Sequence, residues 1–491
     1  MRPRAAVVGA GAGGMCAAAL LAKQGYDVTV FEKNRTHGGR ARTFSEKGFR
    51  FDMGPSWYLM PEVFESYFRI FGWRTSDYFR LKRLDPYYRV FYEDGTVVDI
   101  TSDPVHNRNV FESLEHRSSQ KLQEYLENAK SIYSIAMGKF IMRSYDSLLS
   151  VLDPSLVSGV LRLGLHRSLD SYVSQYFTSA KIAKIMEYTS VFLGTDPRST
   201  PAMYCIMSHV DQGLGVWYPE GGIGRLMDAF RELAESQGAR FKFNAEVERI
   251  EVEGGRVKGV RVNGKLYEAD VVLVNADYEH ADQHLLAPQY RTYSKSYWES
   301  RTLGPSGFIV FLGIRKRLPS LAHHSLFFAD DWNAHFDDIF RHKRWPKNPS
   351  YYVKCTSKDD PSVAPKGCEN VFIFVPVAPG LADSDRARES YFRKVLAHFE
   401  KYVARDEVAK HIIVKRIYSQ RDFASDYNAY MGNALGLAHT LFQTAMFRPR
   451  ISSPKVKGLY YAGHYTHPGV GLPMVVLAAQ IAATEIAERE K

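Results

Sequence analysis

The sequence predicts an α/β fold, in which a Rossmann-like nucleotide-binding domain is discontinuous in the chain and carries an inserted mixed α+β domain. One observation is a glycine-rich turn near residue 10, between an apolar run and a small-residue helix. A second is the strand, glycine loop and helix pattern of residues 457–487. A third is that two long stretches between these units, residues 76–204 and 289–419, do not show the strand, glycine turn and helix pattern. We therefore expect the chain to leave the nucleotide domain twice and return.

The opening unit has the pattern of strand, turn, helix and strand. Residues 5–8 are apolar, residues 9–14 form the glycine turn, and residues 15–23 are rich in Ala and Leu. Residues 28–31 are apolar again and end at Glu32. This βαβ order is typical of dinucleotide-binding domains.

Each key residue of the unit has a physical role. Gly9 permits a tight turn, Gly11 lets a pyrophosphate approach the backbone, and Gly14 lets the helix pack close to the sheet. The N-terminus of the helix offers free N–H groups to the phosphates. Glu32 follows at the position where a carboxylate meets ribose hydroxyls. A signal peptide is the competing interpretation, but glycines interrupt the apolar stretch and a strand follows it.

Composition narrows the function classes. The 491 residues include 64 Lys and Arg against 54 Asp and Glu, a net charge of +10. The positive charges are dispersed, so we expect no nucleic-acid partner. No apolar run approaches the roughly eighteen residues that span a bilayer, and the longest, residues 470–483, contains Pro473 and Gln480. Contact with lipid would therefore be peripheral.

The cysteines indicate a reducing compartment. They are widely scattered and form no CxxC pair, so neither a disulfide framework nor a zinc ribbon is expected. We therefore expect a cytoplasmic protein. The four are Cys16, Cys205, Cys355 and Cys368.

Changes of pattern along the chain suggest the domain boundaries. We assign residues 1–75, 205–288 and 420–491 to the nucleotide domain, and residues 76–204 and 289–419 to a substrate domain with a helical, membrane-facing part. One amphipathic stretch mixes aromatic, aliphatic and cationic residues, as in a helix at a membrane interface. A helix packed on its own domain is the alternative. The stretch contains Ile132, Ile135, Ala136, Lys139, Phe140, Arg143 and Leu148.

Four further motifs carry a resemblance. They are Gly38-Gly39-Arg40, Asp52-Met53-Gly54-Pro55-Ser56-Trp57, Trp217-Tyr218-Pro219-Glu220-Gly221-Gly222 and Thr466-His467-Pro468-Gly469-Val470-Gly471-Leu472-Pro473. With the glycine turn, they resemble the amine-oxidase-like FAD superfamily. Within it, the chain is similar to the bacterial-type carotenoid (phytoene or dehydrosqualene) desaturase family. The resemblance runs from residue 5 to about 485 and is weakest over residues 290–420.

The resemblance implies a GR2-type FAD-binding domain and assigns the cofactor residues. Those of the opening unit would hold the pyrophosphate and the adenosine ribose, and the others would contact the adenine, the ribityl chain and the isoalloxazine. His464 stands where many superfamily members have an acid. The implied set is Gly9, Gly11, Gly13, Gly14, Glu32, Lys33, Gly39, Arg40, Gly54, Pro55, Ser56, Val247, Gly463, His464, Gly471, Leu472, Pro473 and Met474.

The resemblance also implies the chemistry and the partners. The substrate would be a long apolar isoprenoid, a C30 or C40 polyene, and the reaction would remove hydride from an allylic carbon. The protein would lie peripherally on the cell membrane. We find no second GxGxxG after a strand, so we expect oxygen or a quinone, not a bound nicotinamide, to accept the electrons. The sequence leaves the chain length, the number of steps and the oligomeric state open.

Several polar residues invite separate interpretations. His464 and His467 are candidate proton acceptors, because histidine exchanges protons near neutral pH. Their alternative role is to shape the loop by hydrogen bonding. No acid or Cys accompanies them, so we expect no metal site. We expect His323 and His324 on a surface loop and Glu220 at the cap of the following helix.

Two other function classes stay open. One is a redox-neutral polyene isomerase or a carotenoid-oxygenating enzyme on the same scaffold. The other is a non-catalytic prenyl-binding protein, as in the GDP-dissociation inhibitors, which share this fold. The phosphate-binding glycines and Gly38-Gly39-Arg40 weigh against the second class.

Overall fold

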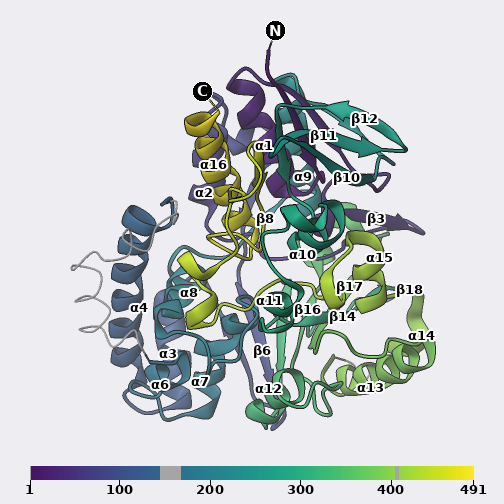
Figure 1. Cartoon of the computed structure of the whole chain (residues 1–491). Helices are drawn as coiled ribbons and strands as arrows, with labels where there is room; N and C mark the ends of the chain where they lie inside the picture. Colours follow the sequence, from purple (N-terminus) through teal and green to yellow (C-terminus); the bar gives the residue numbers. More distant parts are fainter. Residues whose placement is uncertain (1, 144–166, 404–407, 491) are drawn as a thin grey trace.

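The computed structural model describes residues 2–143, 167–403 and 408–490. Its elements form two sheet domains and a helical region, with the helices around α1 and α16 at one pole and α12 at the other (Figure 1). In the same view, α4 lies at the edge of the helical region. Among the described helices, none combines the length and the apolar character needed to cross a membrane.

A parallel five-stranded sheet forms the nucleotide domain. The strand order is β19-β13-β1-β2-β9. Because the chain runs from β1 to β2 on one side and β13 pairs on the other, a topological switch point lies at the end of β1, where ligands bind in such sheets. The strands are β1 (Arg4–Val8), β2 (Asp27–Phe31), β9 (Arg240–Lys242), β13 (Val271–Val274) and β19 (Leu459–Tyr461).

Both faces of this sheet are covered, which explains its nearly unbroken apolar strands. On one face, Ala5 and Val7 join the core that contains α1 (Ala12–Lys23). The helices α9 (Ile223–Ser236) and α16 (Leu472–Arg489) pack against α1. On the other face lies an antiparallel meander of β10 (Val247–Glu253), β11 (Arg256–Val262) and β12 (Lys265–Glu268).

A mixed seven-stranded sheet forms the second domain, in the order β18-β14-β17-β16-β15-β6-β7. Alternation along its strands separates two faces. Phe308 and Val310 face the core under α13 (Asp385–Val403), and Ile309 faces a cavity. The strands are β6 (Tyr88–Tyr92), β7 (Val97–Ile100), β14 (Ser306–Ile314), β15 (His324–Phe328), β16 (Tyr351–Lys354), β17 (Glu369–Val377) and β18 (Ile412–Tyr418).

Helices cover the cavity side of this sheet. The longest is α4 (Ser118–Ile135), which continues as a π-helical turn, η3 (Ala136–Phe140). Of the amphipathic stretch, Ile132 is buried and Ile135 is exposed, whereas Leu148 lies outside the described residues. The other helices there are α3 (Pro104–Leu114), α6 (Leu169–Val173), α7 (Ala180–Glu187) and α8 (Ile206–Ser208).

Shorter elements join the two domains. The pair β5–β8 links residues 81–83 to residues 217–219, whereas the hairpin β3–β4 lies within residues 43–52. The bounds are β3 (Thr43–Glu46), β4 (Phe49–Asp52), β5 (Leu81–Arg83), β8 (Trp217–Pro219), α2 (Pro61–Arg69), α10 (Tyr278–His280), α11 (Lys295–Glu299), α12 (Trp332–Phe340), α14 (Val408–His411) and α15 (Gln420–Tyr427).

Two expectations from the sequence are wrong. His323 and His324 do not lie on a surface loop: both are buried, and His324 begins β15, which is paired on both sides by β6 and β16. Glu220 does not cap α9. The Asp52 carboxylate accepts hydrogen bonds from the Ile223 and Gly224 N–H groups instead, at 3.3 and 3.0 Å. Both errors have the same cause: the strand pairing of β15 and the contact of Asp52 with α9 join residues far apart in the sequence, which local sequence patterns do not predict.

Candidate functional site

A continuous cavity of about 830 Å³ joins the two domains. It begins at the glycine turn, beside Gly9 and Glu32, and extends to Ile309 and Phe374 of the second sheet. Every cofactor residue expected from the sequence lines it except Gly14. The cavity therefore brings together positions from three separate segments of the chain.

The glycine turn is shaped by backbone contacts. Gly9 has φ +99°, a conformation that side chains disfavour. A Cβ on Gly14 would lie 2.1 Å from the Gly9 carbonyl oxygen, so this glycine serves the packing of turn and helix. A Cβ on Gly11 would lie 2.9 Å from Nδ2 of Asn275. The turn thus presents bare backbone to the cavity.

Asn275 is a site residue that the sequence reasoning missed. Its backbone N–H donates to the Val8 carbonyl at 2.8 Å, just beyond β13, and its side chain lines the cavity among the glycines. A Cβ on Gly13 would lie 2.6 Å from its Oδ1, and one on Gly463 3.2 Å from the same atom. A polar residue directly after a buried parallel strand was the available signal.

Glu32 is buried beside the turn. Its carboxylate accepts a hydrogen bond from the Ala10 N–H at 2.8 Å. The Asn34 N–H and side-chain amide both donate to its other oxygen at 2.9 Å. These donors fix the carboxylate at the cavity wall, where its remaining lone pairs can accept from ribose hydroxyls.

The Gly38-Gly39-Arg40 segment docks on the turn. The Gly38 N–H donates to the Ala10 carbonyl at 2.8 Å, and a Cβ on Gly39 would lie 3.2 Å from Gly11 Cα. A Cβ on Gly54 would lie 2.4 Å from the Arg40 carbonyl oxygen. Because these glycines have no side chains, the backbone segments at residues 10–11, 38–40 and 54 pack directly against one another.

Arg40 and Asp277 leave buried polar atoms at the cavity. Arg40 Nη2 lies 3.8 Å from Asp277 Oδ2, and the guanidinium lies over the Tyr427 ring at 5.3 Å. Nε and Nη2 of Arg40 and Oδ2 of Asp277 have no hydrogen-bond partner within the described residues. Burial raises the pKa of Asp277, which Arg40 partly offsets. Unpaired donors and an acceptor beside a glycine turn fit the diphosphate and hydroxyls of FAD.

Lys33 and Val247 also line the cavity. The Lys33 ammonium is engaged elsewhere: it donates to the Ser425 carbonyl at 2.9 Å and to the Asn428 side chain at 2.8 Å. Only the carbon chain and backbone of Lys33 are thus left for a ligand.

A loop near the C-terminus, residues 463–471, closes one side of the cavity together with the start of α16. Gly463, with φ +128°, follows β19, and Gly471, with φ +116°, precedes α16. Leu472, Pro473 and Met474 form the first turn of α16, whose free N–H groups lie at the cavity. This repeats the strand, glycine and helix order of the opening unit.

Arg448 holds this loop in place and was not anticipated from the sequence. It is buried, and its guanidinium donates to the carbonyls of Tyr465, Thr466 and His464 at 3.1, 3.2 and 2.7 Å. It also donates to the carbonyls of Gln443 and Leu437. Burial lowers the pKa of Arg448 to about 10. The cation thus ties residues 464–466 to residues 437–443.

The two loop histidines differ in their surroundings. Burial, with Arg40 and Arg448 nearby, lowers the pKa of His464 well below its ordinary value. His464 Nε2 has no hydrogen-bond partner in the described part of the chain. His467 Nε2 contacts the Ile141 carbonyl at 2.9 Å, and burial lowers the pKa of His467 to about 4. Both rings line the cavity as neutral groups.

Aromatic rings form the wall next to the Gly54-Pro55-Ser56 turn. Trp57 stacks on His324 with centroids 4.2 Å apart and lies 5.7 Å from the Tyr352 ring. Behind this wall, the hydroxyls of Tyr188 and Tyr88 donate to Asp211 Oδ2 at 2.8 and 3.1 Å. Burial raises the pKa of Asp211 to about 7.

The cavity reaches the protein surface at the end of α4. Ile135, Lys139 and Ile141 line it on one side, and Thr444 and Ala445 line it on the other. Several large apolar side chains near these residues are exposed, and we call them the rim cluster. It consists of Ile135, Met142, Leu441, Phe442 and Phe447.

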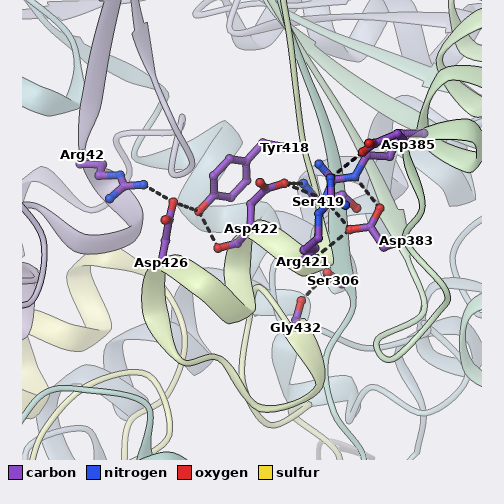
Figure 2. Close-up of polar contacts among 11 residues, drawn as sticks. Arg42, Ser306, Asp383, Asp385, Tyr418, Ser419, Arg421, Asp422, Asp426 and Gly432 are labelled. Carbon is purple, nitrogen blue, oxygen red and sulfur yellow. Dashed lines mark hydrogen bonds and ion pairs between the residues drawn. The ribbon is translucent and has the colours of Figure 1, made fainter. Parts of the chain in front are cut away.

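A polar network fixes α15 between the two domains (Figure 2). Arg42, from the first domain, pairs with Asp426 of α15. The Tyr418 hydroxyl at the end of β18 donates to the same carboxylate at 2.7 Å. Asp422 caps the helix start through the Ser419 N–H at 2.9 Å. The network positions Tyr427 under Arg40.

Comparisons with known proteins agree with this geometry. The model of a protein family described as flavin containing amine oxidoreductase matches residues 12–487. A carotenoid 3,4-desaturase of Haloarcula japonica is 44% identical over 98% of this chain and 97% of its own. A zeta-carotene-forming phytoene desaturase of Myxococcus xanthus is 37% identical over 97% and 92%. The solved structure of an oxidoreductase from Methanosarcina mazei has a TM-score of 0.67 at 19% identity, covering 99% and 100%.

Proposed function

The chain belongs to the flavin-containing amine oxidoreductase family, and we propose that it is an FAD-dependent desaturase of a long polyene in carotenoid biosynthesis. The observation that carries this proposal is the single cavity, which runs from the glycine turn to a wall of apolar side chains. A dinucleotide would fill the first part, and the remaining apolar part suits a hydrocarbon chain of the phytoene or C30 dehydrosqualene type.

The residues of the first part bind and orient the cofactor. The bare backbone at Gly11 and the N-terminus of α1 would hold the pyrophosphate, Glu32 would accept from the ribose, and Arg40 would bind the diphosphate and ribityl chain. The turn at Gly54 and the loop from Gly463 to Met474, which line the cavity, would enclose the flavin. When bound, FAD supplies hydride acceptance from an allylic carbon.

His464 is our candidate for the proton acceptor. Removing two hydrogens requires that a proton leave the carbon next to the hydride donor. His464 is neutral, lines the cavity and has an uncommitted Nε2 within the described residues. His467 is less suited, because its Nε2 is already engaged with the Ile141 carbonyl.

The rim cluster is our candidate for the contact with the membrane. Ile135 lines the cavity, and the other members of the cluster are neighbours in sequence of the lining residues Ile141, Thr444 and Ala445. Lys139 and Arg143 are exposed cations in the same part of the chain as Ile135. Such a surface favours an anionic lipid interface. We therefore propose peripheral association at the cell membrane, with oxygen or a membrane quinone as the electron acceptor.

Expression in cells that accumulate phytoene, or its C30 analogue, tests the function. Pigment analysis should show products with additional conjugated double bonds. Purified protein with FAD should consume an electron acceptor in step with these products. Turnover without acceptor consumption would indicate an isomerase, and incorporation of oxygen into the product would indicate an oxygenating enzyme. An unchanged pigment profile with both substrates contradicts the proposal.

A further inference from the structure

Two arginines share the ring of Tyr427, the last residue of α15. The guanidinium carbons of Arg40 and Arg42 each lie over this ring, 5.3 Å from its centroid. Tyr427 lines the cavity. Among the described residues, Arg40 lines the cavity too, whereas Arg42 does not. Of the two cations at this ring, Arg40 is therefore the one placed to meet a ligand.

The donors of the two arginines differ in their partners. Nη2 of Arg42 donates to Asp426, and the same carboxylate accepts from the Tyr418 hydroxyl at 2.7 Å (Figure 2). Nε and Nη2 of Arg40 have no hydrogen-bond partner within the described residues, and the Asp277 carboxylate lies 3.8 Å from Nη2. The Arg40 side chain is nevertheless 23% exposed. Asp426 thus neutralises Arg42, whereas no carboxylate lies at hydrogen-bond distance from Arg40.

An aromatic ring suits a cation whose donors are kept for a ligand. The ring attracts the guanidinium through its π face, and this attraction uses none of the N–H groups. A carboxylate at the same position would engage two of those donors in a bidentate pair. Without the ring, Arg40 would be a long side chain with several rotamers, and ligand binding would have to order it at a cost in conformational entropy.

The segment that carries Tyr427 is itself held at the nucleotide domain. Lys33 donates to the Ser425 carbonyl at 2.9 Å, and the Asn34 side chain donates to the Asp426 carbonyl at 3.0 Å. The last carbonyls of a helix lack partners within the helix, so these contacts cap the C-terminus of α15. Both donors come from the loop directly after β2. The ring is therefore fixed relative to the part of the cavity where the cofactor ribose is expected.

We infer that Tyr427 is a positioning residue: its ring holds the Arg40 guanidinium in place with its donors free, and so tightens the binding of the FAD diphosphate. The inference rests on the proposed function for the placement of FAD in the cavity, and it does not involve the polyene. No sequence motif indicates this role, because Tyr427 is almost 400 residues away from Arg40 in the chain.

The affinity for FAD measures the contribution of the ring. The FAD-loaded full-length protein is diluted in steps, and the return of free-flavin fluorescence reports Kd. We expect Tyr427→Leu to raise Kd about three- to tenfold, the range of a partly desolvated cation–π contact. Tyr427→Phe keeps the ring, so its Kd should stay within about twofold of the wild type. Unchanged melting temperatures of the FAD-free variants show that the fold is intact.

A double-mutant cycle assigns the effect to Arg40. Arg40→Met should raise Kd by itself, and adding Tyr427→Leu should then raise it by no more than about twofold, because the cation is already absent. Phe423→Leu is the matched control on the same helix, where the Phe423 ring packs on Tyr418 with centroids 5.0 Å apart. Its effect on Kd should be the same with and without Arg40.

Three outcomes overturn the inference. The first is an unchanged Kd in Tyr427→Leu. The second is a loss in Tyr427→Phe as large as that in Tyr427→Leu, which would assign the effect to the hydroxyl. The third is full additivity of Tyr427→Leu and Arg40→Met, which would mean that Tyr427 acts independently of Arg40. Each of these leaves the desaturase function intact, whereas a wild-type protein that binds no FAD would overturn that function as well.

Discussion

Arg448 donates a hydrogen bond from Nη2 to the carbonyl oxygen of His464 at 2.7 Å, and this contact fixes the loop that follows β19. In the described residues, carbonyl groups alone accept from its guanidinium, so the charge is balanced by dipoles rather than by a carboxylate. The loop that closes this end of the cavity therefore depends on Arg448, a residue outside the glycine motif of the loop itself.

Replacing this arginine should release the loop. We expect Arg448→Met to lower the free energy of unfolding by about 2–4 kcal/mol, because it leaves several buried carbonyls unpaired, and to reduce the FAD content of the purified protein. Urea unfolding and the flavin absorbance measure the two effects. Arg450→Met is the control, since this exposed residue lies two positions away. Equal losses in both variants would contradict the role of Arg448.

Gly11→Val should abolish FAD binding, because the side chain would occupy the approach of the pyrophosphate and its Cβ would already meet Asn275 at 2.9 Å. The absorbance of protein-bound flavin after reconstitution measures this. Gly138→Ala is the matched control, because a Cβ at Gly138 meets nothing within 4 Å. Stoichiometric FAD in Gly11→Val would refute the placement of the cofactor.

Asp211 should make stability depend on pH. Its folded pKa, about 7, is above the ordinary 3.8, so the folded protein keeps a proton that the unfolded chain releases. The protonated Asp211 carboxyl therefore contributes to the free energy of unfolding at low pH, and this contribution is lost as pH rises from about 4 to about 7. Asp211→Asn cannot ionise, so its stability relative to wild type should increase between pH 5 and pH 8 in urea unfolding.

Glu253→Gln provides the control for that measurement. Glu253 is exposed and pairs with Lys258, which lowers its pKa. Its replacement should leave the pH dependence of the unfolding free energy close to that of the wild type, because solvent screens an exposed ion pair. If Asp211→Asn follows the same course as this control, Asp211 does not hold a proton in the folded protein.

The rim cluster should contribute to membrane binding. Phe442 is 71% exposed and Phe447 is 45% exposed. We expect Phe442→Ser with Phe447→Ser to weaken flotation with anionic vesicles at least about tenfold, since each buried aromatic contributes roughly 1.5–3 kcal/mol. Trp73→Ser, at a residue 45% exposed away from the cluster, should have no effect. Equal flotation of all three proteins would exclude this surface.

His464→Asn distinguishes a proton acceptor from a loop-shaping residue. If His464 accepts the proton, the variant should retain FAD and lose about 10²–10⁴-fold in turnover, whereas His467→Asn should lose less. Flavin content and single-turnover reduction by the polyene measure the two quantities. Loss of FAD in His464→Asn, with proportionate loss of activity, would assign it to the loop structure instead.

Local patterns predicted the nucleotide domain well. The strands β1 and β2 and the helices α1 and α16 form where the apolar runs and glycines predicted them. The reason is that backbone turns and buried strands impose residue types at fixed spacing. The assignment of domain boundaries stays a prediction, although the five strands of the parallel sheet all come from the segments assigned to that domain.

The second sheet was predicted only in part. Apolar runs predict strands near residues 307–312, 350–355 and 370–376, where β14, β16 and β17 form, but no comparable run indicates β15 or β18. His324 illustrates the difficulty: two adjacent histidines have the polarity of a loop, yet Trp57 and Tyr352 bury one of them. Such burial depends on partners that are far away in the sequence, and no local period encodes them.

The sequence by itself predicted the cofactor site, because a pyrophosphate beside a turn requires glycines at set intervals and a carboxylate after the second strand. Tertiary structure alone decided what completes that site and what shapes the cavity beyond it. Asn275 and Arg448 occupy ordinary positions in the sequence, and each matters through contacts with distant segments. Burial and the pairing of polar atoms, which arise only on folding, give these residues their roles.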